Sequence, residues 1–193
     1  MRIVIPVKPL AQAKSRLGTM LSAADRAVVV RGLLERALAA ARPVAPVSVV
    51  TADALVTAWA RAAGAEVIDE AEVLGLNAAA RLGVDQAGLG GETTVMVLAA
   101  DLPDVSAQAL GAMAEQARPA ALVIAPSRDG GTNALIVAPR ADFQFAYGTG
   151  SFLRHRLEAE RLGMTVLRHE SRGLSVDIDW PCDLADHRDL WAA

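Results

Sequence analysis

The chain has 193 residues, of which 53% are hydrophobic, 21% are charged and 4% are aromatic, and its formal net charge is −3. This length predicts one domain over residues 1–193, with a core made mostly of Ala, Val and Leu. The lack of a basic excess argues against a nucleic-acid partner, although it allows a basic pocket. One cysteine excludes an internal disulfide and any cysteine-cluster metal site. Neither a signal-peptide pattern nor an apolar run of membrane-spanning length occurs, which predicts a cytoplasmic protein without a membrane partner.

The first predicted strand, residues 2–7, leads into a loop that carries three cations, Lys8, Lys14 and Arg16. A basic loop directly after the first strand of an α/β sheet is a natural place for a phosphate group. The loop has no glycine before Gly18, so it matches neither the dinucleotide fingerprint nor the Walker P-loop. The alternative interpretation is a solvated basic surface loop.

Strands and helices alternate along the chain as far as residue 125. Apolar residues at helical spacing predict helices that open near Ser22, Ala54, Gly75 and Ser106. Short apolar runs predict strands at residues 47–51, 66–68, 94–101 and 121–125. Such alternation implies right-handed crossovers and a doubly wound parallel sheet with helices on both faces.

The pattern changes after the turn at residues 129–133. A strand at 134–138 is predicted to be an antiparallel excursion in the C-terminal half. A helix with Leu153, Leu157 and Leu162 follows, then strands at 164–168 and 174–178, and a last helix from Pro181 that includes Trp191. The predicted fold class is therefore α/β: a single-domain, doubly wound, mostly parallel sheet with this excursion.

Three carboxylates are the main candidates for chemistry. Asp101 ends the apolar run of the predicted central strand, and ligands of open α/β sheets bind beyond the carboxyl ends of strands. Asp177 and Asp179 are two residues apart on a predicted strand, so they share a face. If that strand neighbours the central one, the three form an oxygen-only cluster that suits Mg²⁺ and substrate phosphates. Alternatively, Asp101 caps a turn and Asp179 caps the last helix before Pro181.

Two glycine-rich turns add capacity for binding anions. Residues 130–132 can aim several backbone N–H groups at one oxygen cluster. Residues 148–151 precede a helix, where free N–H groups and the helix dipole favour anions. Together with the basic loop and the carboxylates, they indicate a site for two phosphorylated ligands around Mg²⁺.

The remaining polar residues carry weaker signals. Asn77, near a predicted helix start, either caps the helix or presents its amide to a ligand. The histidines have no partner spacing and are interpreted as surface or helix-face residues; they are His155, His169 and His187.

Six motifs in a fixed order cover nearly the whole chain. They are P-V-K-P-L-A-Q-A-K-S-R-L at residues 6–17, G-L-N-A-A at 75–79, L-A-A-D-L-P at 98–103, D-G-G-T-N-A-L at 129–135, Y-G-T-G-S-F at 147–152 and D-I-D-W-P-C-D-L at 177–184. In this order they resemble the guanylyltransferases of coenzyme F420 biosynthesis, the CofC/FbiD family. One departure is Tyr147, where the family often has Phe.

The resemblance implies a nucleotidyltransferase fold of the nucleotide-diphospho-sugar transferase-like, or GT-A-like, kind. It implies transfer of GMP from GTP to the phosphate of a small phosphorylated three-carbon acid, with release of pyrophosphate. That acid is typically phosphoenolpyruvate in bacterial members, 2-phospho-L-lactate in archaeal members and 3-phospho-D-glycerate in some. The product would pass to the downstream F420 transferase.

The charges of the reactants suggest how catalysis would work. An acceptor phosphate oxygen attacks the α-phosphorus of GTP in line, and both partners are anions, so the catalyst must neutralise charge and fix geometry. No general base is needed, because a phosphate oxygen is already ionised near neutral pH. Mg²⁺, as one or two ions, is predicted to bind Asp101, Asp177 and Asp179. The cations that offset phosphate charge are predicted to be Lys14, Arg16 and Lys8. The residues predicted to be catalytic are Lys14, Arg16 and Asp101.

The resemblance also implies the substrate contacts. Thr132, Gly148 and Ser151 would bind the phosphate and carboxylate of the acceptor. The first-strand backbone near Pro6 and the Asn77 region would face the guanosine.

Other functions remain open from the sequence. A molybdopterin- or sugar-phosphate-type nucleotidyltransferase usually has a G-G-x-S-x-R loop where this chain has P-L-A-Q-A-K-S-R. A glycosyltransferase could use D-I-D as its metal motif, although that motif usually follows a central strand. A non-catalytic nucleotide-binding protein would not need three aspartates and Lys14. A homodimer could form through an apolar edge or hairpin at residues 135–145.

Overall fold

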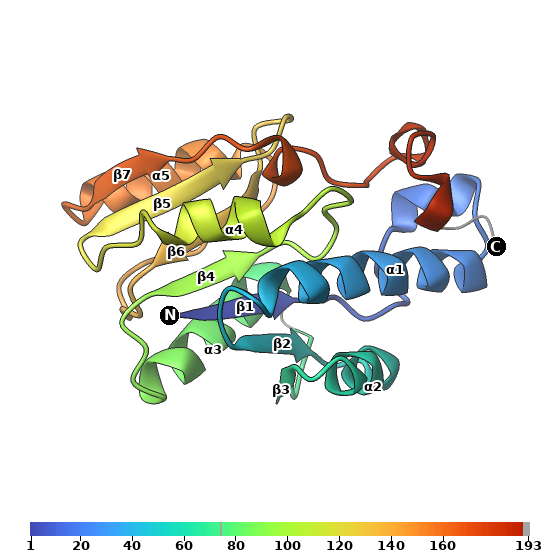
Figure 1. Ribbon diagram of the computed structural model, residues 1–193, viewed down its shortest axis with the longest axis horizontal. Helices are drawn as coiled ribbons and strands as arrows, with labels where there is room; N and C mark the ends of the chain where they lie inside the picture. Colours follow the sequence, from blue (N-terminus) through green and yellow to red (C-terminus); the bar gives the residue numbers. More distant parts are fainter. Residues whose placement is uncertain (74, 191–193) are drawn as a thin grey trace.

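The computed structural model describes residues 1–73 and 75–190, which form a seven-stranded sheet covered by helices on both faces (Figure 1). The strands are β1 (Arg2–Pro6), β2 (Val47–Thr51), β3 (Glu66–Asp69), β4 (Val95–Leu98), β5 (Ala121–Pro126), β6 (Thr132–Val137) and β7 (Thr165–Arg168). The α-helices are α1 (Ala23–Ala41), α2 (Ala54–Ala62), α3 (Leu76–Leu89), α4 (Ala107–Ala114) and α5 (Ser151–Arg161). Four short 3₁₀ turns are η1 (Ser15–Thr19), η2 (Arg172–Leu174), η3 (Pro181–Leu184) and η4 (Arg188–Leu190).

The strand order is β3-β2-β1-β4-β6-β5-β7. Every pairing is parallel except those of β6, which runs antiparallel to both β4 and β5. The predicted doubly wound sheet with one antiparallel excursion is therefore confirmed. The reversed strand matters for the site, because β6 begins at the edge of the sheet where β1 and β4 end.

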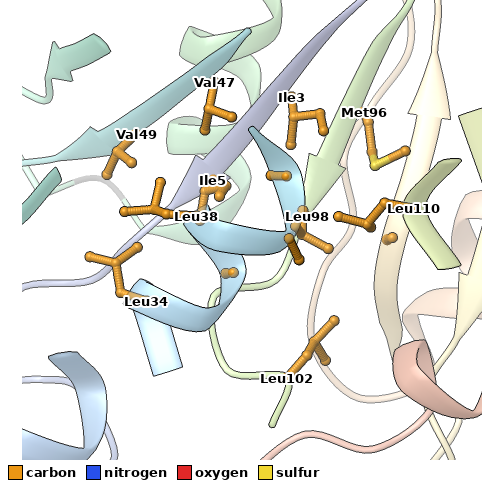
Figure 2. Close-up of a cluster of buried hydrophobic side chains, with 14 of the residues drawn as sticks. Ile3, Ile5, Leu34, Leu38, Val47, Val49, Met96, Leu98, Leu102 and Leu110 are labelled. Carbon is orange, nitrogen blue, oxygen red and sulfur yellow. The ribbon is translucent and has the colours of Figure 1, made fainter. Parts of the chain in front are cut away.

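The core lies in two layers, one on each face of the sheet. Alternate residues of a strand point to opposite faces, so Ile3 and Ile5 pack in one layer and Val4 in the other. Figure 2 shows part of the first layer, where α1 contributes Leu34 and Leu38. Helices α1, α2 and α4 cover this face, and α3 and α5 cover the other. The two layers fix the strand ends that carry the candidate site.

The predicted strand at residues 174–178 is wrong. The structure has η2 followed by an extended segment that is held by isolated hydrogen bonds, such as Arg128 N–H to the Ser175 carbonyl (2.8 Å). The reason is that both edges of β4 are already paired, with β1 and with β6. No free edge beside the central strand is left for another strand.

The predicted last helix from Pro181 is also wrong, because the chain forms only η3 and η4 there. The Asp183 carboxylate accepts hydrogen bonds from the backbone N–H groups of Asp179 (3.0 Å) and Trp180 (2.7 Å). Short polar side chains that bond locally to the backbone compete with helix formation in this way. Trp191, which was expected on this helix, lies outside the described residues.

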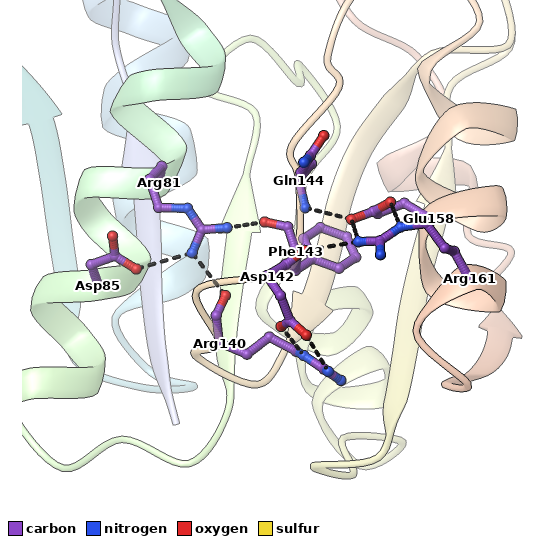
Figure 3. A network of polar contacts seen from close by, with 8 residues as sticks. All are labelled: Arg81, Asp85, Arg140, Asp142, Phe143, Gln144, Glu158 and Arg161. Atoms are coloured by element: carbon purple, nitrogen blue, oxygen red, sulfur yellow. Dashed lines mark hydrogen bonds and ion pairs between the residues drawn. The ribbon is translucent and has the colours of Figure 1, made fainter.

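The segment at residues 135–145 does not form the apolar edge that a homodimer was predicted to use. Strand β6 lies inside the sheet, and Phe143 is buried. Figure 3 shows how polar contacts tie the segment to its neighbours. Arg81 of α3 donates to the carbonyls of Arg140 and Phe143, and Glu158 of α5 accepts from the Gln144 N–H (2.9 Å). The apolar residues of β6 and Phe143 are therefore used within the chain, and a homodimer stays a prediction.

Helix α3 packs unusually close to the sheet at Gly83. A Cβ atom at this position would overlap Cγ1 of Val4 and lie 3.0 Å from Cγ2 of Val50. We therefore expect Gly83→Ala to lower the free energy of unfolding by about 1–3 kcal/mol through overpacking. The matched control is Gly111→Ala in α4, where a Cβ meets nothing within 4 Å. That change should raise stability by up to about 1 kcal/mol, because Ala favours helix more than Gly. Chemical denaturation of both variants checks the opposite signs, and equal effects would contradict the packing argument.

No helix among residues 1–73 and 75–190 combines the length and the hydropathy that crossing a membrane requires.

Candidate active site

A cavity of about 450 Å³ opens at the carboxyl ends of β1 and β4. The loop after β1, the turn after β4 and the turn before β6 line it, together with parts of residues 147–151 and 177–179. This volume is within the range of small-molecule sites, and the position is the one where open α/β sheets bind ligands. The cavity includes Pro6, Lys8, Lys14, Arg16, Asp101, Thr132, Gly148, Ser151, Asp177 and Asp179 from the predicted set.

The structure brings the three predicted carboxylates together. Asp101, Asp177 and Asp179 each offer an oxygen, and these oxygens all lie within 4.8 Å of one another. The cause is not a shared strand face. The backbone N–H of Ile178 donates to the Asp101 carbonyl (3.0 Å), which places the residues on either side of Ile178 next to the turn after β4. Asp179 does not cap a helix, because the residue before η3 is Trp180.

A small third apolar cluster holds the basic loop against this segment. Ile178 packs in it with Leu17 of η1 and with Leu33 of α1, and all three are buried. Leu17 follows Arg16, and Ile178 separates the two late aspartates. Burial of these two apolar residues in one cluster therefore carries the cations of the loop to the carboxylates.

Lys14 lies between two of the carboxylates. Its Nζ atom is 2.5 Å from Asp101 Oδ2 and 3.1 Å from Asp179 Oδ1, and its side chain is only 8% exposed. Burial alone would lower the pKa of Lys14, but the two carboxylates outweigh it and hold the pKa above its ordinary value. Among described residues other than glycine, Lys14 alone has a positive φ (50°). This left-handed backbone is the strained conformation that clusters at functional sites.

The other two cations of the loop differ in their surroundings. Arg16 NH1 lies 2.8 Å from Asp179 Oδ2, and its guanidinium stacks 4.9 Å from the centre of the Trp180 ring. Lys8 is exposed and makes no ion pair within the described part of the chain. Lys14 and Arg16 are thus preorganised by the carboxylates, and Lys8 is free to meet an incoming anion.

The carboxylate cluster fits a divalent cation such as Mg²⁺. Its donors are all oxygens, as Mg²⁺ prefers, and they lie close enough to share one ion. Burial, followed by the charges of Asp101 and Asp179, raises the pKa of Asp177 to about 6. A carboxylate whose charge is disfavoured by its own neighbours gains from a nearby cation.

Some of the backbone N–H groups of the glycine-rich turns are already used within the chain. The Gly130 and Gly131 N–H groups donate to the Ser127 carbonyl (3.1 Å) and to Asp129 Oδ1 (3.1 Å). The Ser151 N–H donates to the Gly148 carbonyl (3.0 Å). Thr132, Gly148, Thr149 and Ser151 all line the cavity.

Asn77 neither caps α3 nor lines the cavity. The residue before α3 is Gly75, and the Asn77 amide oxygen accepts the backbone N–H of Tyr147 (2.6 Å). Asn77 thus fixes the start of the loop that carries Gly148 and Ser151.

The sequence analysis interpreted the histidines as surface or helix-face residues and did not predict that any of them is buried. In the structure His155 is 0% exposed, and His169 is also buried. Leu153 and Leu157, which were expected on this helix, lie on it and are 49% and 50% exposed. The buried face consists of Ser151, His155 and Ala159. Their spacing of four residues was a usable signal, but hydropathy hid it because two of the three are polar.

Burial, with a smaller contribution from the Arg154 charge, lowers the pKa of His155 to about 4. In the unfolded chain this pKa is about 6.5, so between these values the unfolded state binds a proton that the folded state does not. The stability that the neutral His155 ring contributes is therefore fully present above pH 6.5. It decreases as the pH falls below 6.5 and is lost as the pH falls through 4. From pH 7.5 to pH 5, His155 should lower the free energy of unfolding by about 2 kcal/mol. Denaturation at both pH values, for the wild type and His155→Gln, measures this difference, and parallel pH curves would contradict it.

Comparisons with known proteins agree with this geometry. The model of the family described as "Guanylyl transferase CofC like" matches residues 1–187. The phosphoenolpyruvate guanylyltransferase of Sphaerobacter thermophilus is 37% identical over 187 residues, which cover 95% of this chain and 90% of that protein. The 3-phospho-D-glycerate guanylyltransferase of Phenylobacterium zucineum is 38% identical (90% and 83% covered). The 2-phospho-L-lactate guanylyltransferase of Methanothermobacter thermautotrophicus is 32% identical (95% and 82% covered).

The fold is also similar to solved structures. A crystal structure from Desulfovibrio desulfuricans G20, described as a nucleotide-diphospho-sugar transferase, superposes with a TM-score of 0.79 at 19% identity. The match covers 95% of this chain and 84% of that one. It confirms the expected fold class and says nothing more about activity.

Proposed function

The chain belongs to the CofC-like guanylyl transferase family, and on that premise we propose that it transfers GMP from GTP to the phosphate of phosphoenolpyruvate. The products are enolpyruvyl-diphospho-guanosine and pyrophosphate. One observation carries the proposal: three carboxylates and a buried lysine meet in a cavity at the carboxyl ends of β1 and β4. Membership makes the protein a guanylyltransferase with GTP as a substrate, as the resemblance to the F420 enzymes implied.

The acceptor is the finer part of the proposal. Relatives of 37%, 38% and 32% identity are named for phosphoenolpyruvate, 3-phospho-D-glycerate and 2-phospho-L-lactate. All three acids combine one phosphate and one carboxylate on three carbons. Hydroxyls of Thr132 and Ser151, with the backbone at Gly148, are the groups we assign to this anionic molecule. The alternatives to phosphoenolpyruvate are therefore the other two acids.

The residues of this chain supply charge and position to the reaction. A phosphate oxygen of the acceptor forms a bond to the α-phosphorus of GTP, and the bond from that phosphorus to pyrophosphate breaks. No proton has to be removed from the attacking oxygen, which agrees with the absence of a histidine from the cavity lining of the described chain. Lys14 and Arg16 offset the negative charge that gathers on the phosphates, and such preorganised charges act strongly in a cavity.

The three carboxylates would hold Mg²⁺, as one or two ions. When bound, the metal neutralises phosphate charge and orients the reacting groups. We assign Lys8 to the triphosphate, and the backbone at Pro6 to the guanosine. Asn77 would act on the nucleotide site only through the loop that it fixes. We further propose that residues 1–193 form one catalytic domain whose product passes to the downstream F420 transferase.

The decisive experiment measures pyrophosphate release from GTP and Mg²⁺ with one acceptor at a time. The acceptors are phosphoenolpyruvate, 2-phospho-L-lactate and 3-phospho-D-glycerate, with a sugar 1-phosphate as control and ATP in place of GTP as a second control. Because the product can be unstable, parallel reactions include the downstream transferase and its deazaflavin acceptor. Release with phosphoenolpyruvate and GTP alone is the expected result. Release only with another acid would replace the acceptor. Tight GTP binding without release from any acid would favour a non-catalytic binding protein.

A further inference from the structure

A chain of buried hydrogen bonds begins at His155 and ends at the cavity. The backbone N–H of Ala146 donates to Nε2 of His155 (2.9 Å). A backbone amide can only donate, so Nε2 carries no hydrogen, and the hydrogen of the neutral ring is on Nδ1. The ring is neutral because burial lowers the pKa of His155 to about 4.

This tautomer determines the direction of the next hydrogen bond. Nδ1 lies 3.1 Å from Thr132 Oγ1 and therefore donates to it. Ser151 Oγ donates to the same oxygen (3.0 Å). Both lone pairs of Thr132 Oγ1 are then occupied, so the Thr132 hydrogen is free for a ligand. If the bond between the two hydroxyls is reversed, the free hydrogen belongs to Ser151. In both cases the hydroxyl pair presents one hydrogen to the cavity.

The opposite tautomer would give the opposite polarity. With Nδ1 as an acceptor, Thr132 would donate to the ring, and as long as Ser151 donates to Thr132 as it does here, only lone pairs would face the cavity. Lone pairs repel a phosphate or a carboxylate. The Ala146 N–H therefore decides, through His155, whether this end of the cavity attracts an anion.

We propose that His155 is a positioning residue that fixes the Thr132–Ser151 hydroxyl pair as a hydrogen-bond donor to an anionic group of the acceptor. The proposal rests on the proposed function, because it assumes that the acceptor binds at these hydroxyls. It gives a role to a buried histidine that does not line the cavity.

The surroundings of His155 hold its ring in one orientation. The ring packs edge-on against Tyr147 (4.8 Å between centroids) and stacks on Phe143 (6.2 Å, 20°). Arg154 donates to the Ala146 carbonyl through Nε (3.1 Å) and NH2 (2.7 Å), which fixes the chain beside the donated N–H. A fixed ring with a fixed donor is what a defined tautomer requires.

The tautomer can be read in the wild-type protein without any substrate. Long-range ¹H–¹⁵N correlation spectra at pH 7 should show a His155 ring that is protonated on Nδ1 and bare on Nε2, with His155→Asn used to assign the signal. A ring protonated on Nε2 would overturn the proposal. This measurement does not depend on which acceptor, if any, the enzyme uses.

Two variants separate the two nitrogens of the ring. In His155→Asn the amide can take the place of Nδ1 and still donate to Thr132. In His155→Gln the amide reaches the place of Nε2, so it meets Ala146 and loses Thr132. We expect His155→Gln to raise the KM for the acceptor by about tenfold, with the KM for GTP unchanged, because one hydrogen bond to a charged group is weakened. His155→Asn should restore most of the affinity.

A double-mutant cycle with Thr132→Val tests whether His155 acts through the hydroxyl. His155→Gln should have little further effect on the acceptor KM when Thr132 is already Val. Equal KM values for the Asn and Gln variants, or additive effects in the cycle, would overturn the proposal. Thermal unfolding of each variant shows whether it is folded. Inactivity of the wild type with every acid would instead be a failure of the proposed function, and the ring tautomer would still be measured.

Discussion

Asp101→Asn should lower kcat on the order of 10³-fold or more, and weaken Mg²⁺ binding. The Asp101 carboxylate is one of three within 4.8 Å of one another, and it also accepts the closest contact of Lys14. An amide keeps the shape of the side chain but removes the negative charge that a hard cation and a lysine both need. Loss of about 4 kcal/mol of charge stabilisation in the transition state corresponds to that change in rate. Steady-state kinetics with saturating GTP and acceptor measure it.

The matched control is Asp104→Asn, in the same turn after β4. Asp104 is exposed and does not line the cavity. The same chemical change there should leave kcat and the Mg²⁺ dependence near the wild-type values. If Asp101→Asn retained most of its activity while Asp104→Asn lost it, the assignment of the carboxylate cluster would be wrong. Calorimetric titration with GTP separates a loss of catalysis from a loss of nucleotide binding.

The alternation of strands and helices could be predicted because the sequence patterns agree with the local structure. Apolar runs such as residues 47–51 are buried on both faces, and Ser22 begins α1 with a capping box. The position of Asp101 after the central strand followed from the same pattern. Strand β4 itself ends at Leu98, three residues earlier than expected, and a turn carries the carboxylate into the cavity.

The convergence of the three aspartates was expected for a reason that does not hold. Asp177 and Asp179 are not on a strand, and one hydrogen bond from Ile178 to the Asp101 carbonyl places them. Sequence periodicity carries no information about an isolated tertiary hydrogen bond. It also cannot show that the site beside β4 is already taken by β6, which prevents the expected pairing.

His155 shows a second limit of reading periodicity from hydropathy. A polar residue is buried when its hydrogen bonds are satisfied, and here the partners come from Thr132, on β6, and from Ala146, in the loop before α5. Those partners are known only once the fold is known. The apolar residues Leu153 and Leu157 of the same helix are about half exposed, so hydropathy does not identify its buried face. The site is thus predictable where it depends on strand ends, and not where it depends on buried polar networks.

Lys14→Met should produce two effects of opposite sign. We expect kcat/KM for GTP to fall by roughly 10²- to 10³-fold, because a preorganised charge beside the phosphates is lost. In the absence of GTP, the affinity for Mg²⁺ should rise by at least about tenfold. The reason is that Lys14 Nζ, at 2.5 Å and 3.1 Å from two of the carboxylates, competes with a metal ion for the same negative charge. Removal of Lys14 leaves that charge for the metal alone.

Calorimetric titration with Mg²⁺ at pH 8 measures the second effect, since the pKa of Asp177 is about 6 and its carboxyl group is then ionised. Without metal, Lys14→Met should also be less stable than the wild type, because three partly buried carboxylates then lie together without the cation between them, and Mg²⁺ should restore the stability. The control is Lys8→Met, the same substitution at a lysine that is exposed and makes no ion pair with the described residues. It should leave the Mg²⁺ affinity of the GTP-free enzyme unchanged. Weaker Mg²⁺ binding in Lys14→Met would contradict this prediction. It would mean that Lys14 orders the carboxylates and does not compete with Mg²⁺ for them, so that the metal binds only while the lysine is present.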